Sequence, residues 1–535
     1  MRRIQSNIDP QSPDYRTYSR HNRELAAKLH ERQRKARFER PQRDIDRLRK
    51  QNKLMVQERI QLLLDRDTPF LELSTLAANM SYDGTVPGAG LVSGIGIVNG
   101  REVIVMASDS AIKGGAWYPL TVKKMVRTTD IAIENRLPMI HLVDAAGAFL
   151  PLQSDLFADR YMAGRLFRNQ CVLSAIGVKQ IALVLGHSTA GGAYVPTLCD
   201  YSIMVRGTGG VFLGGPPLVK AATGEDVSAD ELGGADIHCA KSGTADYAVD
   251  TEQEGIALTR EIVGTFARPV KAAIERCEPE EPHYDPQELY GIIPDDIRKQ
   301  FNMREVIARI VDGSRFHEFK PDYGTTIVCG YAYLYGWKIG VIGNNGVLFS
   351  DSANKCTQFM QICNRDRVPV IFLQNITGFM VGKEYEHGGI TKNGAKMLMV
   401  QSNLDVPKLT VMTNGSFGAG NYAMCGRAFD ARFLFSWPNS QISVMGMEQA
   451  AKTLSQLRIN SLERHGKKLS DEDMHHIFEE IKQDYLEKSS AYHATSELWD
   501  DGIIDPADTR KVLGIALSVA LNRDFGQTPN GVLRI

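Results

Sequence analysis

The sequence lacks the signatures of several large protein classes. None of its eight cysteines in 535 residues belongs to a Cys-x-x-Cys pair, which argues against both a zinc ribbon and a disulfide framework. No apolar run approaches the roughly 18 residues of a membrane span, and no secretory signal follows the basic N-terminus. The net charge of -1 argues against a dedicated nucleic-acid binder. We therefore expect an intracellular protein of two or three domains, in the cytoplasm or, for a eukaryotic source, the mitochondrial matrix.

Common catalytic motifs are scarce as well. The glycine-containing stretch 94–99 lacks the third glycine of a dinucleotide-binding turn. His187 and Ser188 are neighbours and do not form the Gly-x-Ser-x-Gly elbow of a serine hydrolase. No cluster of His, Asp and Glu has the spacing of metal ligands, so no metal is predicted in this chain.

Basic residues are concentrated at the N-terminus. The first 60 residues contain seventeen Lys and Arg against eight Asp and Glu. The pattern from 22 to 64 is helical apart from Pro41, which is expected to end or kink a helix. We expect residues 1–66 to form a helical arm. Two interpretations stay open: an apolar stripe docks the arm on the body and leaves a solvated charged face, or its cations contact anionic phosphates.

From residue 67 onward, apolar strands alternate with amphipathic helices, which is typical of an α/β protein. The run RLPMIHLVDAAGAF at 136–149 is similar to the run RVPVIFLQNITGF at 367–379, which is one residue shorter and lies roughly 230 residues later. Such a repeat predicts two domains of one fold. An acidic, proline-rich segment predicts a linker between them. The expected boundaries are 67–275 for the first domain, 276–300 for the linker and 301–535 for the second domain.

Two strands in each predicted domain end in a turn of small residues. These turns lie at 144–149 and 189–194, and again at 375–379 and 416–421. Small residues leave backbone N–H groups unshielded, and at the start of a helix these groups lie at the positive end of the dipole. A tight turn that merely requires glycine is the alternative for each stretch. The recurrence favours two oxyanion sites, one for each of two reactants that pass through an enolate-like state.

Six motifs carry a resemblance to a known family. They are KGGAWYP (113–119), TAGGAYVP (189–196), FLGGPPLVKAATGE (212–225), NITGFMVG (375–382), SFGAGNY (416–422) and WDDGIIDP (499–506). On these motifs the chain resembles, from about residue 20 to Ile535, the carboxyltransferase (β) subunits of biotin-dependent acyl-CoA carboxylases. The runs 214–220 and 417–422 are similar to the methylcrotonoyl-CoA branch, with geranyl-CoA carboxylase as its near relative.

The resemblance implies a fold and an assembly. The fold would be two tandem crotonase-like (ClpP/crotonase ββα-spiral) domains behind the N-terminal helical extension. The subunits would form a hexameric core, with each active site between the N domain of one protomer and the C domain of another. The chain has no Met-Lys-Met biotinylation site and no obvious ATP-binding domain. Biotin and the biotin carboxylase are therefore expected on a partner (α) subunit.

The resemblance also implies roles for the turns. Gly191 and Gly192 would donate to the thioester oxygen, within an acyl-CoA site made by Lys113, Gly114, Gly115, Ala146, Gly147, Ala148, Ala190 and Tyr194. Ala419 and Gly420 would donate to the ureido oxygen of biotin, within a site made by Thr377, Gly378, Phe379, Phe417, Gly418 and Asn421. Carboxybiotin would release CO2, and the biotin left behind would take a proton from the γ-carbon of the acyl-CoA. The expected reaction is the carboxylation of 3-methylcrotonoyl-CoA in leucine degradation.

Three departures from that branch bear on the acyl group. Ala116-Trp117, His187-Ser188 and Met447 stand where Thr-Tyr, Ser-Cys and Gly are common. A bulky Trp117 or Met447 would reshape the acyl pocket, so geranyl-, propionyl- and acetyl-CoA stay open as substrates. Two further functions stay open: a stand-alone crotonase-fold hydratase, isomerase or decarboxylase, and a non-catalytic scaffold that keeps the fold.

Overall fold

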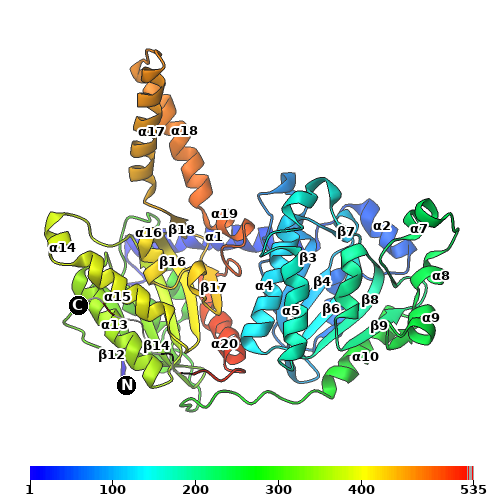
Figure 1. Ribbon diagram of the computed structural model, residues 1–535. Helices are drawn as coiled ribbons and strands as arrows, with labels where there is room; N and C mark the ends of the chain where they lie inside the picture. The colour runs from blue at the N-terminus through cyan, green and yellow to red at the C-terminus, as the bar shows by residue number, and fades with distance from the viewer. Residues whose placement is uncertain (527, 529–532, 534–535) are drawn as a thin grey trace.

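The computed structural model describes residues 1–526, 528 and 533. The end of the predicted second domain, at 527, 529–532 and 534–535, lies outside the described residues. In the described part, the strands form two eight-stranded mixed sheets, so the α/β expectation is confirmed. Figure 1 shows the two sheets side by side, each packed against helices. Within the same part, no helix is long and apolar enough to cross a bilayer.

The first sheet has the strand order β11-β9-β8-β6-β4-β3-β2, with β10 paired to the end of β8. An antiparallel hairpin, β3–β4, leads into parallel strands that α4 and α5 connect. Burial on both faces explains why these strands are continuous runs of Val, Ile and Leu. The elements are β2 (Leu71–Leu73), β3 (Leu91–Val98), β4 (Arg101–Ser108), β5 (Ala116–Trp117), α4 (Pro119–Asn135), β6 (Met139–Ala145), β7 (Gly147–Ala148), α5 (Ala163–Ala175), β8 (Gln180–Thr189), α6 (Tyr194–Thr197), β9 (Tyr201–Val205), β10 (Gly210–Phe212), α7 (Pro216–Thr223), α8 (Ala229–Gly233), α9 (Ala235–Ile237), β11 (Tyr247–Val249) and α10 (Glu252–Gly264).

The second sheet repeats this plan in the order β1-β12-β13-β14-β15-β16-β17, with β1 (Arg2–Arg3) contributed by the N-terminus and β18 paired to the end of β16. The hairpin β13–β14 leads into parallel strands in the same way. The elements are α11 (Leu289–Ile292), α12 (Met303–Ala308), β12 (Arg315–Glu318), β13 (Ile327–Leu334), β14 (Trp337–Asn344), α13 (Ser350–Arg365), β15 (Val370–Ile376), α14 (Lys383–His387), α15 (Ile390–Ser402), β16 (Lys408–Phe417), α16 (Gly418–Ala423), β17 (Phe433–Ser436), β18 (Gln441–Ser443), α17 (Met447–Arg464), α18 (Asp471–Ser489), α19 (Ala491–Ser496) and α20 (Thr509–Ala520).

The strand register repeats even in its irregularities. In the first sheet, Val143 pairs with Val184, and the next pair is Ala145 with Ser188. In the second sheet, Gln374 pairs with Met412, and the next pair is Ile376 with Ser416. In both cases the longer strand bulges by the same amount just before its turn. Bulges of this kind re-aim the chain, so both turns leave their sheets in the same way.

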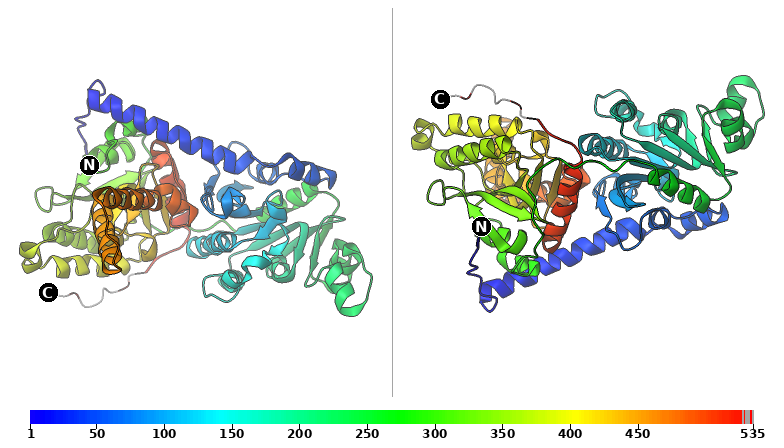
Figure 2. Two further views of the ribbon diagram at one scale, coloured as in Figure 1. Left: turned by 90° about the horizontal axis from the view of Figure 1, so that it is seen from above. Right: turned by 90° about the horizontal axis from the view of Figure 1, so that it is seen from below.

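The N-terminal arm consists of helices, as expected, but it lies across both halves. Ser12 caps α1 (Pro13–Phe38), which ends before Pro41, and α2 (Gln42–Lys50) and α3 (Val56–Leu63) follow. Arg2–Arg3 form β1, an edge strand of the second sheet. Figure 2 shows α1 running along one side of the molecule past both halves. The arm therefore connects the halves in addition to packing on the first.

The linker segment and the second half each differ from the sequence expectation at one place. The linker segment 276–300 contains the short helix α11, which is buried and packs against α1. Helices α17 and α18 form a long hairpin that projects from the second half (Figure 1). The repeat did not predict this hairpin because the first half has only the short helices α7 to α9 at the equivalent place.

Candidate active site

The predicted turns lie at the carboxyl ends of neighbouring parallel strands. Strands β6 and β8 end at the turns of the first half, and β15 and β16 end at those of the second. Figure 1 shows β7 and α16, which mark these turns, in separate halves of the chain. In open α/β sheets this edge is where ligands bind.

In the first half, β8 leads into η5 (Ala190–Ala193) through an unusual backbone conformation. Ala190 has a φ of 53°, a left-handed conformation that is strained for a residue with a Cβ. The buried Ser188 hydroxyl donates to Gly192 O at 2.8 Å and fixes the turn from inside. The first N–H groups of a helix have no intrahelical acceptor, so the N–H of Gly191, the second residue of η5, is placed to bind an anion, and Gly192 follows it in the same turn.

The other predicted acyl-CoA residues gather around this turn. Strand β5 pairs with β7, which brings the loop 113–115 beside residues 146–148. Thr189 Oγ1 donates to Ala146 O at 3.2 Å and joins the two turns. A Cβ at Gly192 would lie 3.7 Å from the ring of Trp117, which is 5% exposed. Tyr194 begins α6 and is half exposed. The fold therefore brings all ten predicted residues of the acyl-CoA side to one edge of the first sheet.

In the second half, the equivalent turn is built from amides and hydroxyls. Gly418 has a φ of 56°, as Ala190 does in the first half. Asn421 Nδ2 donates to Ser416 Oγ at 2.7 Å, and that hydroxyl donates to Gln374 Oε1 at 2.5 Å. The Asn421 amide is therefore engaged in the interior. A Cβ at Gly420 would lie 2.4 Å from Ile376 Cγ1 and 3.4 Å from the Cα of Gly378, so the two turns of this half are in direct contact.

The predicted biotin residues divide between two cavities. A cavity of about 420 Å³ is lined by Gly418, Ala419, Asn421, Tyr422, Ile442, Ser443, Val444, Tyr485, Lys488, Ser489 and Trp499. A second cavity, of about 480 Å³, is lined by Asp296, Ile297, Arg298, Thr377, Phe417, Gln441, Gly446, Met447, Glu448, Gln449 and Lys482. Phe379 packs against α15, where a Cβ at Gly394 would lie 3.2 Å from its ring. Gly418 and Ala419 therefore open on a different space from Thr377 and Phe417.

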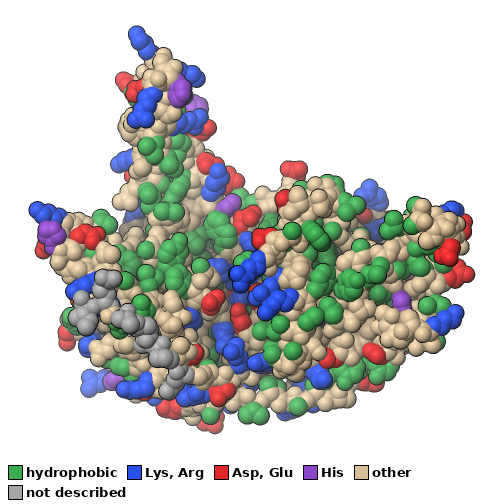
Figure 3. Space-filling view, in the orientation of Figure 1, with side chains coloured by type: hydrophobic (Ala, Val, Ile, Leu, Met, Phe, Trp, Pro, Cys, Tyr) green, Lys and Arg blue, Asp and Glu red, His purple; other side chains and the backbone are tan. Residues whose placement is uncertain are grey.

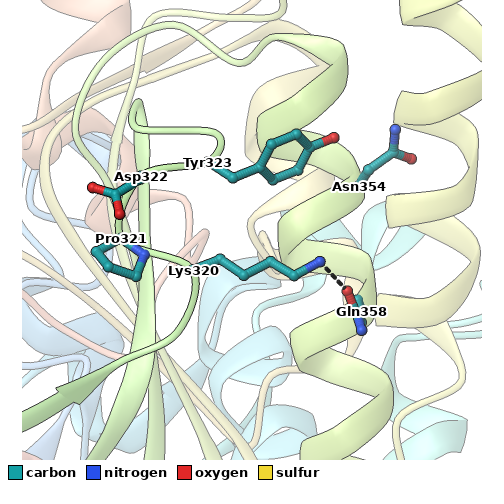
Figure 4. Close-up of a pocket in the computed structure, with 6 residues that line it drawn as sticks. All are labelled: Lys320, Pro321, Asp322, Tyr323, Asn354 and Gln358. Carbon is teal, nitrogen blue, oxygen red and sulfur yellow. Dashed lines mark hydrogen bonds between the residues drawn. The ribbon is translucent and has the colours of Figure 1, made fainter.

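A further cavity of about 410 Å³ lies away from both turns (Figure 4). It is lined by Lys320, Pro321, Asp322, Tyr323, Asn354 and Gln358, and Lys320 Nζ donates to Gln358 Oε1 at 2.6 Å. None of the predicted site residues lines it, so we do not assign it to the reaction.

A buried ionic network beneath the first-half turns was missed by the sequence reasoning. Lys53 Nζ lies 3.0 Å from Asp144 Oδ1, and Arg59 bridges Asp144 Oδ2 at 3.2 Å and Glu252 Oε1 at 2.5 Å. Burial alone would raise the pKa of Asp144, but Arg59 and Lys53 outweigh it and hold that pKa below its usual range. Burial lowers the pKa of the nearby His187, and Lys53 adds to the effect. The available signals were the excess of cations in the arm and an acidic residue at the end of β6.

The described residues contain no group of three or more His, Cys, Asp or Glu that could hold a metal ion. The arrangement instead offers backbone N–H groups in turns of small residues at the ends of two equivalent strands. Such groups stabilise oxygen atoms on which negative charge develops. Each half of the chain therefore supplies one candidate oxyanion site.

Comparisons with known proteins agree over nearly the whole chain. The Carboxyl transferase domain model matches residues 47–531. A probable mitochondrial methylcrotonoyl-CoA carboxylase beta chain of Drosophila melanogaster is 48% identical, over 99% of this chain and 95% of that one. The biotin-dependent 3-methylcrotonyl-coenzyme A carboxylase beta1 subunit of Mycobacterium tuberculosis is 49% identical, over 90% and 91%. The solved beta subunit of geranyl-CoA carboxylase from P. aeruginosa has a TM-score of 0.88 at 39% identity, covering 99% of both chains.

Proposed function

This chain belongs to the carboxyl transferase domain family, and we propose from that premise that it is the β chain of a biotin-dependent methylcrotonoyl-CoA carboxylase. It transfers a carboxyl group from carboxybiotin to the γ-carbon of 3-methylcrotonoyl-CoA. The observation that carries this proposal is the pair of equivalent turns at Ala190–Ala193 and Gly418–Ala423. Two oxyanion sites match a reaction in which negative charge develops on two oxygen atoms, the thioester oxygen of the acyl-CoA and the ureido oxygen that biotin would supply.

The first-half turn takes the acyl-CoA. The N–H groups of Gly191 and Gly192 donate to the thioester oxygen and stabilise the negative charge that develops when the γ-proton leaves. The Trp117 ring forms an apolar wall beside Gly192. Residues 113–115 and 146–148 line the rest of the site, and Ala190 and Tyr194 flank the turn.

The second-half turn takes biotin, which supplies both the carboxyl group and the base that accepts the γ-proton. The residues present fit such a group. The cavity at Gly418 and Ala419 is walled by Tyr422 and Trp499, and a Cβ at Gly418 would lie 2.9 Å from Val444 O. The N–H groups of Ala419 and Gly420 would hold the ureido oxygen of biotin. Thr377, Gly378, Phe379, Phe417 and Asn421 shape the surroundings of that turn.

The separation of the two turns supports an assembly. We assign a crotonase-like fold to the domains 67–275 and 301–535, and we place the first-half turn of one protomer against the second-half turn of another in a hexameric core. Large apolar side chains are exposed in both halves, as expected of surfaces that are covered in an assembly (Figure 3). They are Leu150, Phe157, Tyr161 and Tyr194 in the first half and Tyr422, Val444, Leu454 and Leu457 in the second.

The biotin carboxylase and the biotin carrier belong to a partner (α) subunit. Several relatives are described as mitochondrial. We accordingly place a eukaryotic protein of this kind in the mitochondrial matrix and a bacterial one in the cytoplasm.

One experiment tests the function. The purified chain, assembled with a biotinylated carboxylase partner, is assayed with ATP, bicarbonate and four acyl-CoAs side by side. We expect the highest kcat/KM with methylcrotonoyl-CoA, followed by geranyl-CoA, and no turnover by the chain alone. A preference for geranyl-CoA would favour a second candidate function, that of a geranyl-CoA carboxylase β chain. The similarity to the solved geranyl-CoA carboxylase beta subunit, with a TM-score of 0.88, is the observation that favours this candidate. Conversion of an enoyl-CoA by the isolated chain without ATP would contradict the carboxylase assignment.

A further inference from the structure

The proposed reaction gives no role to the basic N-terminal arm. Two of its arginines contact the segment that leads into the acyl-CoA loop 113–115. Arg40 lies 2.7 Å from Asp109 Oδ2, and the two side chains are only 3% and 2% exposed. Arg47 donates to Ser110 O at 2.6 Å. The arm therefore fixes the chain three to four residues before Lys113.

The same contacts continue into the second acyl-CoA turn. Ser110 Oγ donates to Asp144 Oδ2 at 2.8 Å, and Asp144 directly precedes the turn that contains residues 146–148. A Cβ at Gly115 would lie 2.3 Å from Asp144 O, so the two segments are packed backbone against backbone. The carboxylate and carbonyl of Asp144 thus connect two of the three segments that surround the proposed acyl-CoA site.

Strand β8, which carries the third segment, passes directly over the Asp144 carboxylate. A Cβ at Gly186 would lie 1.9 Å from Asp144 Oδ1 and 2.7 Å from Lys53 Nζ. Lys53 and Arg59, both from the arm, hold that carboxylate, and Arg59 also pairs with Glu252. Two cations and two anions are balanced in this buried cluster. Hydrogen bonds between charged groups at such short distances are directional, so the cluster fixes positions as well as neutralising charge.

We propose that Arg40, Lys53 and Arg59 of the arm are positioning residues for the acyl-CoA half of the site, acting through Asp109 and Asp144. This inference rests on the proposed function and adds a role for the arm to it. The three cations hold the segments before 113–115, 146–148 and 190–192 in one arrangement. Because the N–H groups of Gly191 and Gly192 have to meet the thioester oxygen, a displacement of about 1 Å is sufficient to lower the rate a hundredfold.

The second half supports its turn without the arm. At the position of Asp144 the repeat has Asn375, whose amide donates to Gln300 Oε1 at 3.3 Å. Asn414 Nδ2 donates to Asn375 Oδ1 at 3.1 Å. Among the described residues, no hydrogen bond or ion pair joins an arm cation to these amides. Loss of an arm cation is therefore expected to affect acyl-CoA and to leave biotin binding unchanged.

The test compares KM values for the two reactants. Lys53→Met, Lys53→Arg, Asn375→Ala and the control Arg34→Gln are made in the full chain. The assembled carboxylase gives kcat and KM for methylcrotonoyl-CoA. The reverse transfer, from the carboxylated acyl-CoA to free biotin, gives KM for biotin; in it the carboxyl group moves to the biotin nitrogen, and that nitrogen's proton returns to the γ-carbon. Arg34 is a suitable control because it pairs with Glu31 and Glu39, within the exposed face of the arm.

We expect Lys53→Met to lower kcat/KM for acyl-CoA by about 10- to 100-fold with an unchanged KM for biotin, and Lys53→Arg to restore most of the loss. Asn375→Ala is expected to raise KM for biotin selectively, and Arg34→Gln to change neither value. A folded, assembled Lys53→Met chain with an unchanged kcat/KM for acyl-CoA, or with a KM for biotin raised as much as the KM for acyl-CoA, would overturn the proposal.

Folding and function are separated by two further measurements. If Lys53→Met fails to assemble by light scattering, Arg40→Gln takes its place, with the same expected and contradicting outcomes. Calorimetric binding of methylcrotonoyl-CoA to the isolated chain reports on the arm independently of turnover. A wild-type chain that binds acyl-CoA but never carboxylates it contradicts the proposed function alone, whereas equal affinity of the wild-type and Lys53→Met chains contradicts the role of the arm alone.

Discussion

The two halves of this chain build equivalent turns on different chemistry. Beneath the first-half turn, the Asp144 carboxylate is ionised and held by Lys53 and Arg59. Beneath the second-half turn, the equivalent Asn375 is neutral and bonded to other amides. The strand bulge and the left-handed residue are nevertheless the same in both. The same turn geometry can thus be held from beneath either by ion pairs or by hydrogen bonds between neutral amides. In the first half, the ion pairs bring the N-terminal arm into contact with the residues beneath the turn.

A second buried carboxyl extends the contrast. Asp500 is also fully buried, but its nearest partners are the Ser436 hydroxyl, 2.6 Å from Oδ2, and the Gly502 N–H, 3.0 Å from Oδ1. Burial raises the pKa of Asp500 to about 6. Its neighbour Asp501 pairs with Arg127 and Arg427, which depress the pKa of Asp501 in spite of its burial. Of these two buried neighbours, the carboxyl that pairs with cations has a lowered pKa, and the carboxyl held by a hydroxyl and an N–H has a raised pKa.

Replacing Asp144 and Asn375, the equivalent residues beneath the two turns, is expected to give the largest difference in stability between the two halves. Asp144→Ala leaves Arg59 and Lys53 buried beside a missing partner, which we expect to destabilise the first half by about 3–5 kcal/mol. Asn375→Ala removes neutral hydrogen bonds and is expected to lose about 1–3 kcal/mol. Urea unfolding followed by circular dichroism measures both. Equal shifts of the two midpoints would show that the ionic network contributes no more than the amides.

Alanine at the two key glycines separates activity from folding. A Cβ at Gly192 would meet its nearest atom, Ser188 Oγ, at 3.4 Å, so Gly192→Ala is expected to fold and to crowd the oxyanion. We expect its kcat to fall by about 10²- to 10³-fold. At Gly420 the Cβ would lie 2.4 Å from Ile376 Cγ1, so Gly420→Ala is expected to lose about 1–3 kcal/mol of stability as well. Steady-state kinetics and thermal melts check the pair, and an active Gly192→Ala enzyme would contradict the assigned site.

The pH dependence of stability tests the raised pKa of Asp500, the buried carboxyl without an ion pair. Because the pKa of Asp500 rises from 3.8 unfolded to about 6 folded, the folded state binds the extra proton between these values. Its contribution to stability is present below about pH 4, is lost as pH rises through 6 and is constant above that. Asp500→Asn is expected to remove this dependence and to stabilise the protein by about 2–3 kcal/mol at pH 8. Melting temperatures of the wild-type and Asp500→Asn proteins from pH 4 to 8 measure this difference. Parallel curves of melting temperature against pH would contradict the raised pKa of Asp500.

The smallest effect concerns the left-handed residue of each turn. Gly418→Ala introduces strain at a φ of 56° and a contact of 2.9 Å with Val444 O, so we expect a loss of about 1–2 kcal/mol. Ala190→Gly relieves the equivalent strain at a φ of 53° but adds unfolded-state entropy, and a gain of at most about 1 kcal/mol is expected. Chemical denaturation of both variants decides the signs. A stabilised Gly418→Ala protein would contradict the assigned backbone conformation.

The strands and turns around the site could be predicted from the sequence because their signals are local. Apolar runs placed β6, β8, β15 and β16, and the small residues after them placed the turns. The structure brings the ten predicted acyl-CoA residues to one edge and connects the second-half turns through Gly420 and Gly378. The arm was also expected to be helical, although Pro41 alone did not predict its division into three helices.

By itself, the sequence determined the repeat, the pair of small-residue turns and the excess of cations in the first 60 residues. Only the tertiary structure decided which cations meet which carboxyls. Arg59 reaches Asp144 across 85 residues and Glu252 across 193, and no local pattern encodes such pairs. The partners are selected by packing, because a buried charge is tolerated only where the fold delivers an opposite charge at hydrogen-bonding distance. The sequence could therefore predict that the arm is basic, but only the packing of the arm on the first half decided that its cations lie beneath the first-half turn.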